Sequence, residues 1–288
     1  MEEKEISIPI KNGKLFCQTA GNINTGNPLI VLHGGPGLGC QYLLPQMKAL
    51  GQFSFAIFYD QRGTGLSVST DDWYAHPFET YCQDLDTLRK SFNLEKISLL
   101  AHSFGNVFAA FYASEFPQHV DKMVFVNSVP LSSQDYLDFV KHRSAIVDQH
   151  KSELDAIRQL PDFQQGDSKT IERFYRIYFK NYFAKPHLAN TLTLTMTPQA
   201  AINNFKIYDM FFDNINKHSF SLYGKLQAID KSSLIISGDK DVIPLHYMEH
   251  LHQSIPSSKY IEIKDCGHFA YIDQPDILFD EVRKFILL

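Results

Sequence analysis

Leu99–Gly105 reads LLAHSFG, an apolar run that leads into Ser103. The residues two positions before and after this serine, Ala101 and Gly105, are small. A nucleophilic serine on a tight strand-to-helix turn needs small residues at both positions, because the backbone beneath the strained turn is crowded. So short a pattern also arises by chance, and the alternative is an ordinary serine that caps a helix. The strand-like run before it and the helix-like stretch after it favour the nucleophile.

Short apolar runs of the same kind recur along the chain and predict the strands of one sheet. Near-continuous apolar runs without polar alternation are typical of parallel strands that helices cover on both faces. The predicted strands are Pro28–His33, Phe53–Asp60, Lys96–Ser103, Lys122–Asn127, Ser233–Ser237 and Lys259–Lys264. Amphipathic stretches predict helices at Phe78–Phe92, Asn106–Phe116 and Asp276–Ile286. This alternation of strands and helices predicts an α/β fold.

Two parts of the chain do not follow this alternation. Glu5–Ile10 and Lys14–Ala20 predict an antiparallel hairpin, because Asn12-Gly13 between them is a typical hairpin turn. Residues 130–228 lack strand-like runs and instead carry apolar residues at helical spacing. This aromatic stripe consists of Ile171, Phe174, Tyr175, Tyr178, Phe179, Tyr182 and Phe183. We therefore predict a core domain (1–129 and 229–288) and an inserted helical cap (130–228). Most residues of the stripe are expected to pack the cap helix against its neighbours; the alternative is that they line a substrate pocket.

A carboxylate and a histidine follow the two late strands, in the order that hydrolases with this serine motif use. SLIIS is followed by Gly238-Asp239-Lys240-Asp241, and KYIEIK by Asp265-Cys266-Gly267-His268. Loops at the carboxyl ends of parallel strands are where such sheets place their functional sites. We predict Asp241 as the catalytic acid, with Asp239 as a turn former and the alternative acid. His268 is the predicted base.

The chemistry of a serine nucleophile requires these partners. Serine attacks only when an imidazole accepts its proton, and a buried carboxylate fixes the imidazole tautomer and stabilises the imidazolium. The tetrahedral intermediate also needs hydrogen-bond donors for its oxyanion. One predicted donor is the backbone N–H of Phe104, directly after the serine. The other is Gly35, in the loop His33-Gly34-Gly35-Pro36-Gly37, where glycines let the backbone approach the substrate closely.

Two further motifs carry a family resemblance. HGGPG follows the strand at Pro28–His33, and Asp60–Ser67 reads DQRGTGLS. Together they resemble the proline iminopeptidase family of α/β-hydrolases, which includes prolyl aminopeptidases and related amino-acid amidases. The resemblance implies a mostly parallel central sheet with helices on both faces and an inserted helical cap. It also implies the triad Ser103, Asp241 and His268 and the oxyanion donors Gly35 and Phe104.

The chain departs from this family where the substrate's amine is bound. The family holds the free α-amine with carboxylates, one in an N-E-F segment of the cap and another that can follow the catalytic aspartate. The corresponding positions here are Asn204, in Asn203-Asn204-Phe205, and Val242. An amine partner must then come from elsewhere in the cap. Glu172 beside the aromatic stripe is the candidate, with Asp209 and Asp213 as alternatives, although a solvated surface charge is the ordinary role for any of these acids.

Composition and charge exclude several other classes of function. The net charge of −5 and the scattered Lys and Arg residues predict no nucleic-acid partner and no anionic membrane surface. The N-terminus, MEEKEISIPI, lacks the basic start and apolar stretch of a signal peptide. No apolar run approaches the ~18 residues that a membrane span needs. The four cysteines are too dispersed to suggest a disulfide framework. We therefore expect a cytoplasmic protein; the sequence does not indicate its oligomeric state.

No cofactor or metal ion is expected. GGPGLG does not form the G-x-G-x-x-G pattern of dinucleotide sites. His246–His250 matches the zinc pattern H-x-x-E-H, but it falls on a helix after the acid loop and lacks the structural context of a zinc protease.

The predicted function is a serine aminopeptidase that releases N-terminal proline, or another small residue, from short peptides through an acyl-enzyme. A hydrolase of neutral esters or amides is the alternative. A non-catalytic ligand-binding protein on the same scaffold is a third possibility, since fold alone does not fix function. The complete triad argues against it.

Overall fold

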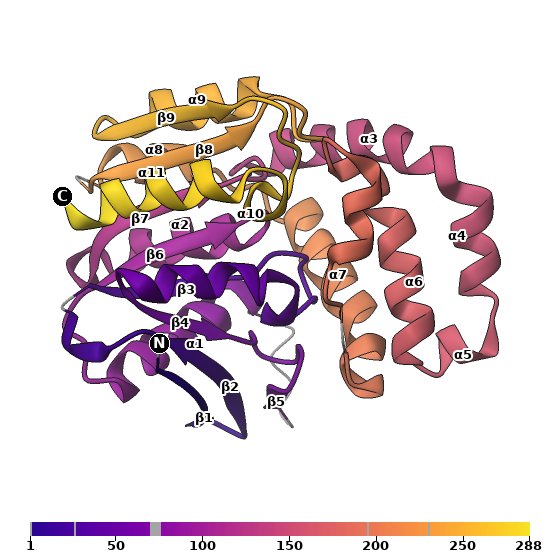
Figure 1. The fold of residues 1–288 in the computed structure, drawn as a ribbon, viewed down its shortest axis with the longest axis horizontal. Helices are drawn as coiled ribbons and strands as arrows, with labels where there is room; N and C mark the ends of the chain where they lie inside the picture. The colour runs from indigo at the N-terminus through magenta and orange to yellow at the C-terminus, as the bar shows by residue number, and fades with distance from the viewer. Residues whose placement is uncertain (1, 26, 70–75, 195, 230) are drawn as a thin grey trace.

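A single mixed sheet forms the centre of the molecule (Figure 1). The computed structural model describes residues 2–25, 27–69, 76–194, 196–229 and 231–288. Among them the strand order is β1-β2-β4-β3-β6-β7-β8-β9, and the short strand β5 pairs with β2. The strands are β1 (Glu3–Ile10), β2 (Gly13–Ala20), β3 (Pro28–Leu32), β4 (Phe55–Tyr59), β5 (Val68–Ser69), β6 (Ile97–His102), β7 (Val120–Val126), β8 (Ser233–Gly238) and β9 (Ser258–Ile263).

The direction of the strands follows the sequence patterns. The hairpin β1–β2 is antiparallel, with Asn12 in its turn at φ 55°, and β2 pairs antiparallel with β4. From β4 to β9 each neighbouring pair is parallel. All residues of β4, β6 and β8 are buried, as their near-continuous apolar runs predict for strands covered on both faces. The predicted α/β fold is confirmed.

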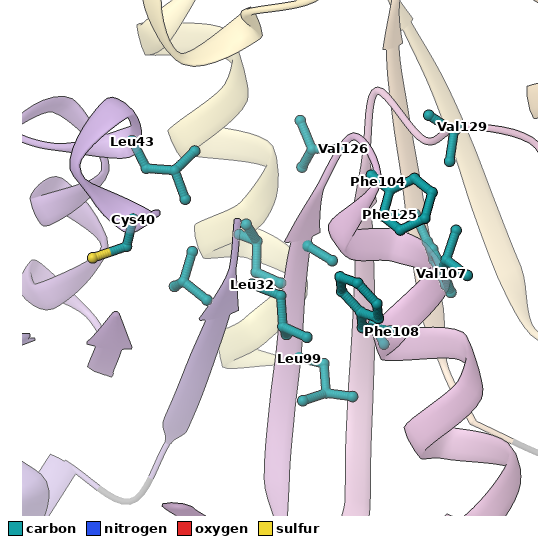
Figure 2. Packing of buried hydrophobic residues seen from close by; sticks show 14 of the residues in the cluster. Leu32, Cys40, Leu43, Leu99, Phe104, Val107, Phe108, Phe125, Val126 and Val129 are labelled. Atoms are coloured by element: carbon teal, nitrogen blue, oxygen red, sulfur yellow. The ribbon is translucent and has the colours of Figure 1, made fainter. Parts of the chain in front are cut away.

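Helices cover both faces of the sheet. On one face α1 (Pro77–Ser91), α2 (Gly105–Glu115), α8 (Tyr223–Gln227) and α9 (His246–Ser254) contact one another in turn. On the other face α10 (Ala270–Asp273) and α11 (Pro275–Leu287) contact the 3₁₀ helix η3 (Gln46–Gln52). Figure 2 shows part of the packing on the first face, where Phe104, Val107 and Phe108, at the start of α2, lie beside the central strands. The ring centroids of Phe104 and Phe108 are 5.3 Å apart.

A helical layer lies beyond the carboxyl ends of the parallel strands (Figure 1). It is an insertion between β7 and β8, which are themselves hydrogen-bonded neighbours. Its helices are α3 (Ser133–Val147), α4 (Lys151–Arg158), α5 (Pro161–Gln164), α6 (Ser168–Tyr178) and α7 (Pro198–Lys217), with 3₁₀ turns that include η6 (Lys180–Tyr182). We propose that this layer is the cap of the predicted division into 1–129, 130–228 and 229–288. No helix among the described residues is both long and apolar enough to cross a membrane.

Candidate active site

Ser103 occupies a strained turn between β6 and α2. Its backbone lies in the left-handed region at φ 56°, which is rare for a residue with a side chain and costs conformational energy. The Ser103 N–H donates a hydrogen bond of 3.0 Å to the Val126 carbonyl of the neighbouring strand. A Cβ on Gly105 would lie 2.7 Å from the carbonyl oxygens of Leu32 and His33, so only glycine fits there. This close packing is the physical reason for the small residue two positions after the serine.

The structure brings Ser103, His268 and Asp241 into one chain of hydrogen bonds. Ser103 Oγ lies 2.8 Å from His268 Nε2, and His268 Nδ1 lies 3.0 Å from Asp241 Oδ1. The side chains of His268 and Asp241 are only 5 % and 1 % exposed. The His268 N–H donates a 2.6 Å hydrogen bond to the carbonyl of Tyr182 in the cap, so the cap helps to fix the histidine loop. The distances fit a serine activated by an imidazole and an orienting carboxylate.

Asp241 is held from a second side by Asn127, which the sequence analysis did not single out. Asn127 Nδ2 donates 2.7 Å to Asp241 Oδ2 and 3.2 Å to the Gly267 carbonyl, while the Ile243 N–H donates 3.1 Å to Asp241 Oδ1. Asp239 instead accepts a 3.3 Å bond from the Cys266 N–H and faces Lys264 at 3.9 Å. The structure therefore brings Asp241 to His268 and leaves Asp239 in the turn.

The two predicted oxyanion donors lie in adjacent loops. A Cβ on Gly34 would lie 2.8 Å from Ser103 Cβ and 3.1 Å from the backbone N of Phe104, which shows how closely the HGGPG loop approaches the serine turn. The Gly34 N–H is already used, because it donates 2.7 Å to the Tyr42 hydroxyl. The N–H groups of Gly35 and Phe104 have no hydrogen-bond acceptor within the described parts of the chain, and both residues line the cavity above Ser103. Both N–H groups can therefore serve a substrate oxygen.

A buried network built on His102 links three loops of the site. Tyr42 Oη lies 2.8 Å from His102 Nδ1, and His102 Nε2 lies 2.8 Å from the His268 carbonyl. A carbonyl can only accept, so Nε2 carries the proton and Nδ1 accepts from Tyr42. Burial, with a smaller effect from His268, lowers the pKa of His102 well below its usual value, so the ring is neutral. The oxyanion loop, the serine strand and the histidine loop are thus joined through one imidazole.

Removing the Tyr42 hydroxyl should destabilise the fold by about 1–3 kcal/mol, because Tyr42→Phe leaves two buried groups, Gly34 N–H and His102 Nδ1, without partners. Tyr271→Phe is the matched control, since its hydroxyl only donates one 3.0 Å bond, to the Tyr42 carbonyl. Urea unfolding of both variants measures the difference. Equal losses of unfolding free energy would show that the His102 network contributes no more than one ordinary hydrogen bond.

The DQRG motif is hydrogen-bonded to the loop that carries the oxyanion donor Gly35. Asp60 accepts hydrogen bonds from the N–H groups of Cys40 (2.7 Å) and Leu66 (2.8 Å). Gln61 donates through its backbone N–H to His33 Nε2 (3.1 Å) and through its side chain to the His33 carbonyl (2.9 Å). Burial lowers the pKa of His33 to about 4, so this ring stays neutral and can accept at Nε2. The two motifs that carry the family resemblance are therefore parts of one hydrogen-bonded unit.

A cavity of about 320 Å³ lies over Ser103, between core and cap. Its walls are largely aromatic and include five of the seven stripe residues: Phe174, Tyr175, Tyr178, Phe179 and Tyr182. Phe174, Tyr175, Phe179 and Tyr182 are also buried. We expected most of the stripe to pack the cap and not to line a pocket. The structure shows both, because the same rings pack the cap and line the cavity.

The predicted amine-binding acids do not reach this cavity. Glu172 pairs with Arg176 at 2.9 Å and is absent from the cavity lining. Asp209 and Asp213 are exposed on α7, and Asp213 pairs with Lys217 at 3.2 Å. The placement of Glu172 therefore corrects the sequence-based candidate. One position along a helix is a rotation of about 100°, enough to turn Glu172 from the buried row that begins at Ile171 onto the outer ridge.

Two acids that the sequence analysis missed do line the cavity. They are Asp148, which follows α3, and Asp155 on α4. Asp155 pairs with Arg158 at 3.0 Å, whereas Asp148 forms no ion pair with the described residues. Asn204 also lines the cavity, and its Oδ1 accepts a short hydrogen bond from the Tyr175 hydroxyl. Among the site residues that the sequence analysis missed, only Asn127 could have been recognised from the sequence, because it is a polar residue at the carboxyl end of a central strand.

Comparison with known proteins places this geometry in a family. Residues 27–275 match the family model described as alpha/beta hydrolase fold. The chain belongs to this family. It is therefore a hydrolase with the α/β-hydrolase fold.

Relatives within the family bear the name that the motifs suggested. The chain is 28% identical to a protein named proline iminopeptidase from Heyndrickxia coagulans, over 97% of each chain. A crystal structure of proline iminopeptidase from Mycobacterium smegmatis superposes with a TM-score of 0.70 at 19% identity, covering 99% of this chain and 98% of that one. An epoxide hydrolase, CorEH, superposes with a TM-score of 0.72 at 17% identity over 99% of both chains, so these structural likenesses show the fold alone. The resemblance to the proline iminopeptidase family is confirmed.

Proposed function

We propose that this α/β-hydrolase is a serine aminopeptidase that releases N-terminal proline, or another small residue, from short peptides. The observation that carries the proposal is the hydrogen-bond chain Ser103–His268–Asp241 beneath an aromatic cavity of about 320 Å³. Relatives named proline iminopeptidase match nearly the whole chain, which supports this choice of substrate. Aromatic walls suit the apolar pyrrolidine ring, and the cavity size suits a small substrate.

In the proposed mechanism Ser103 Oγ attacks the carbonyl carbon of the first residue. His268 Nε2 accepts the serine proton, and the Asp241 carboxylate stabilises the imidazolium through Nδ1. The N–H groups of Gly35 and Phe104 donate to the oxygen as it becomes negative. His268 then returns the proton to the leaving nitrogen, the C–N bond breaks and an acyl-enzyme remains. Water attacks that ester by the same steps and restores Ser103.

An aminopeptidase must also accept a charged amine. A buried ammonium without a partner is costly, so a carboxylate or several oriented acceptors must meet it. We assign this role to Asp148, because it lines the cavity and has no ion-pair partner in the described chain. Asp155 is engaged by Arg158 and is the weaker candidate.

The alternative, a hydrolase of neutral esters or amides, rests on Asn204 and Val242. These residues stand where related aminopeptidases carry carboxylates, and Asn204 Oδ1 already accepts from Tyr175. An amide whose oxygen is engaged offers N–H donors to a ligand, which suits a neutral or negative group better than an ammonium.

Blocking the amine separates the two proposals. Prolyl 4-nitroanilide should be hydrolysed at least ~100-fold faster, in kcat/KM, than its N-acetyl form, because acetylation removes the charge and adds bulk at the closed end of the site. Asp148→Asn should reduce this preference about tenfold, the scale of one charge-assisted hydrogen bond. Glu172→Gln is the matched control and should leave the preference within twofold, because Glu172 lies outside the cavity.

Equal turnover of the blocked amide, or of a plain 4-nitrophenyl acyl ester, would overturn the aminopeptidase proposal and favour the general hydrolase. If Asp148→Asn keeps the wild-type preference for the free amine over the acetylated substrate, the aminopeptidase proposal stands, but Asp148 is not the residue that binds the amine.

A further inference from the structure

The cavity over Ser103 contains an arginine that the proposed reaction has not used. Arg143 belongs to α3 and lines the cavity together with Ser103 and His268. No Asp or Glu in the described part of the chain forms an ion pair with it. Arg143 is half-buried, and a guanidinium partly withdrawn from water is commonly matched by an anion.

The surroundings of Arg143 are aromatic rather than acidic. One guanidinium nitrogen donates 2.6 Å to the Tyr208 hydroxyl. The guanidinium carbon lies 5.6 Å from the ring centroid of Phe139 and 5.7 Å from that of Tyr208. Ring faces stabilise a cation and hold its plane in position, but they do not neutralise its charge. A guanidinium has several N–H donors; Tyr208 takes one, and the Tyr136 hydroxyl lies within hydrogen-bonding reach of another. The other donors are available to a ligand in the cavity.

The position of Arg143 relative to His268 indicates which part of a substrate it meets. The Tyr182 ring lies edge-on to the His268 ring, with centroids 5.5 Å apart. Burial raises the pKa of Tyr182 well above its usual value, and Tyr178 adds to this, while the positive charge of Arg143 acts against them. Arg143, Tyr182 and His268 all line the cavity over Ser103. His268 is the group that returns a proton to the leaving nitrogen, so a carboxylate on the leaving part of the substrate would lie in this part of the cavity, and a comparison of acyl-side and leaving-side anions tests the placement.

We propose that Arg143 binds a carboxylate on the leaving part of the substrate, so that dipeptides with a free C-terminal carboxylate are the preferred substrates. This rests on the proposed aminopeptidase function. The planar guanidinium matches a carboxylate with two parallel N–H···O bonds. Asp148 and Arg143 line the same cavity, and a dipeptide carries an amine and a carboxylate on opposite sides of its scissile carbonyl. Each further residue would move the carboxylate by up to ~3.5 Å, beyond the fixed guanidinium.

Other cations of the cavity are less suited to this role. Arg158 is engaged by Asp155 at 3.0 Å and stacks on Phe174 at 5.0 Å. Lys151 is exposed at the start of α4. Among the cations of the described chain that line the cavity, only Arg143 is both at least half-buried and not ion-paired with a carboxylate.

The test compares kcat/KM for the dipeptide Pro-Ala with that for Pro-Ala amide, which lacks only the negative charge. Wild type should prefer the free acid by roughly 10- to 100-fold, as expected for a charge-assisted bidentate contact. Arg143→Met should reduce this ratio to within about threefold of unity, and Arg143→Lys should give an intermediate ratio because the charge remains without the planar fork. Arg173→Met is the matched control: it removes the same charge from the exposed face of α6, outside the cavity, and should leave the ratio intact.

The ratio is internal to each variant, so a loss of folded protein does not change it, and Arg143→Lys keeps the test open if Arg143→Met does not fold. A wild-type ratio near unity, or an unchanged ratio in Arg143→Met, would overturn the proposal. The preference for free over acetylated prolyl anilide would then still stand, which separates this failure from failure of the aminopeptidase function.

A second comparison distinguishes the two ends of a substrate. 4-Nitrophenyl hemisuccinate carries its carboxylate on the acyl side, whereas 4-nitrophenyl butyrate is neutral. We expect no more than threefold discrimination between them, with or without Arg143. Strong preference for the hemisuccinate that disappears in Arg143→Met would place the anion on the acyl side and overturn the dipeptide assignment.

Discussion

Replacing Ser103 with alanine should lower kcat by roughly 10⁴- to 10⁶-fold, the scale on which serine hydrolases lose activity when the nucleophile is removed. The physical reason is the geometry of Ser103 Oγ, 2.8 Å from His268 Nε2 on a turn at φ 56°. Without the hydroxyl no acyl-enzyme forms, and only substrate binding and the oxyanion donors remain. A fluorophosphonate probe should label wild type at one site and leave Ser103→Ala unlabelled.

Ser144→Ala is the matched control. Ser144 lines the same cavity from α3, but its hydroxyl donates to the Val140 carbonyl at 2.9 Å and has no imidazole beside it. Activity and labelling should therefore persist in this variant. Labelling of Ser103→Ala at the wild-type rate would mean that another residue is the nucleophile and that the turn at Ser103 is only structural.

The core of the fold could be predicted because its signals are local. Runs such as PLIVL and FAIFY are apolar throughout, which is typical of strands buried on both faces. The predicted ends differ from the observed ones by one or two residues, as at β7, which begins at Val120 rather than Lys122. Such shifts reflect the last hydrogen bonds of each strand, which depend on its neighbours and not on its own residues.

The candidate triad was predictable for a related reason. In a parallel sheet all carboxyl ends meet at one edge, so polar residues directly after strands are brought together whatever their separation in sequence. Ser103 and His268 follow β6 and β9, and Asp241 follows β8. Asn127 follows β7 by the same rule and could have been found with them.

The cap residues could not be predicted, because a helical pattern defines a buried face without saying what that face meets. Tyr175 and Glu172 lie on one helix, yet Tyr175 lines the cavity and Glu172 pairs with Arg176 outside it. Arg143 gave no signal, since an arginine on an amphipathic helix is ordinarily solvated. Its role emerges only when α3, α6 and α7 are placed around it. The His102 network depends likewise on Tyr42, distant in sequence.

Asp241→Asn should lower kcat by about 10⁴-fold, whereas Asp239→Asn should lower it less than tenfold. An asparagine at 241 can present an N–H to His268 Nδ1, which favours the tautomer with the proton on Nε2 and leaves no base for Ser103. Asn127 Nδ2, which now donates 2.7 Å to Asp241 Oδ2, does not relieve this, because a donor there draws the new amide oxygen toward itself and turns the amide NH₂ toward His268.

The two substitutions are a matched pair, since they remove the same charge two residues apart in one loop. Asp239 accepts only a 3.3 Å bond from the Cys266 N–H and faces Lys264 at 3.9 Å, so its loss affects the turn and not the imidazole. Steady-state kcat across pH 6–9 measures both variants. Asp241→Asn should also regain activity as pH rises, because hydroxide can replace the missing base. A larger loss in Asp239→Asn than in Asp241→Asn would reverse the assignment of the acid, and it would mean that the 3.0 Å contact between His268 and Asp241 does not persist in the working enzyme.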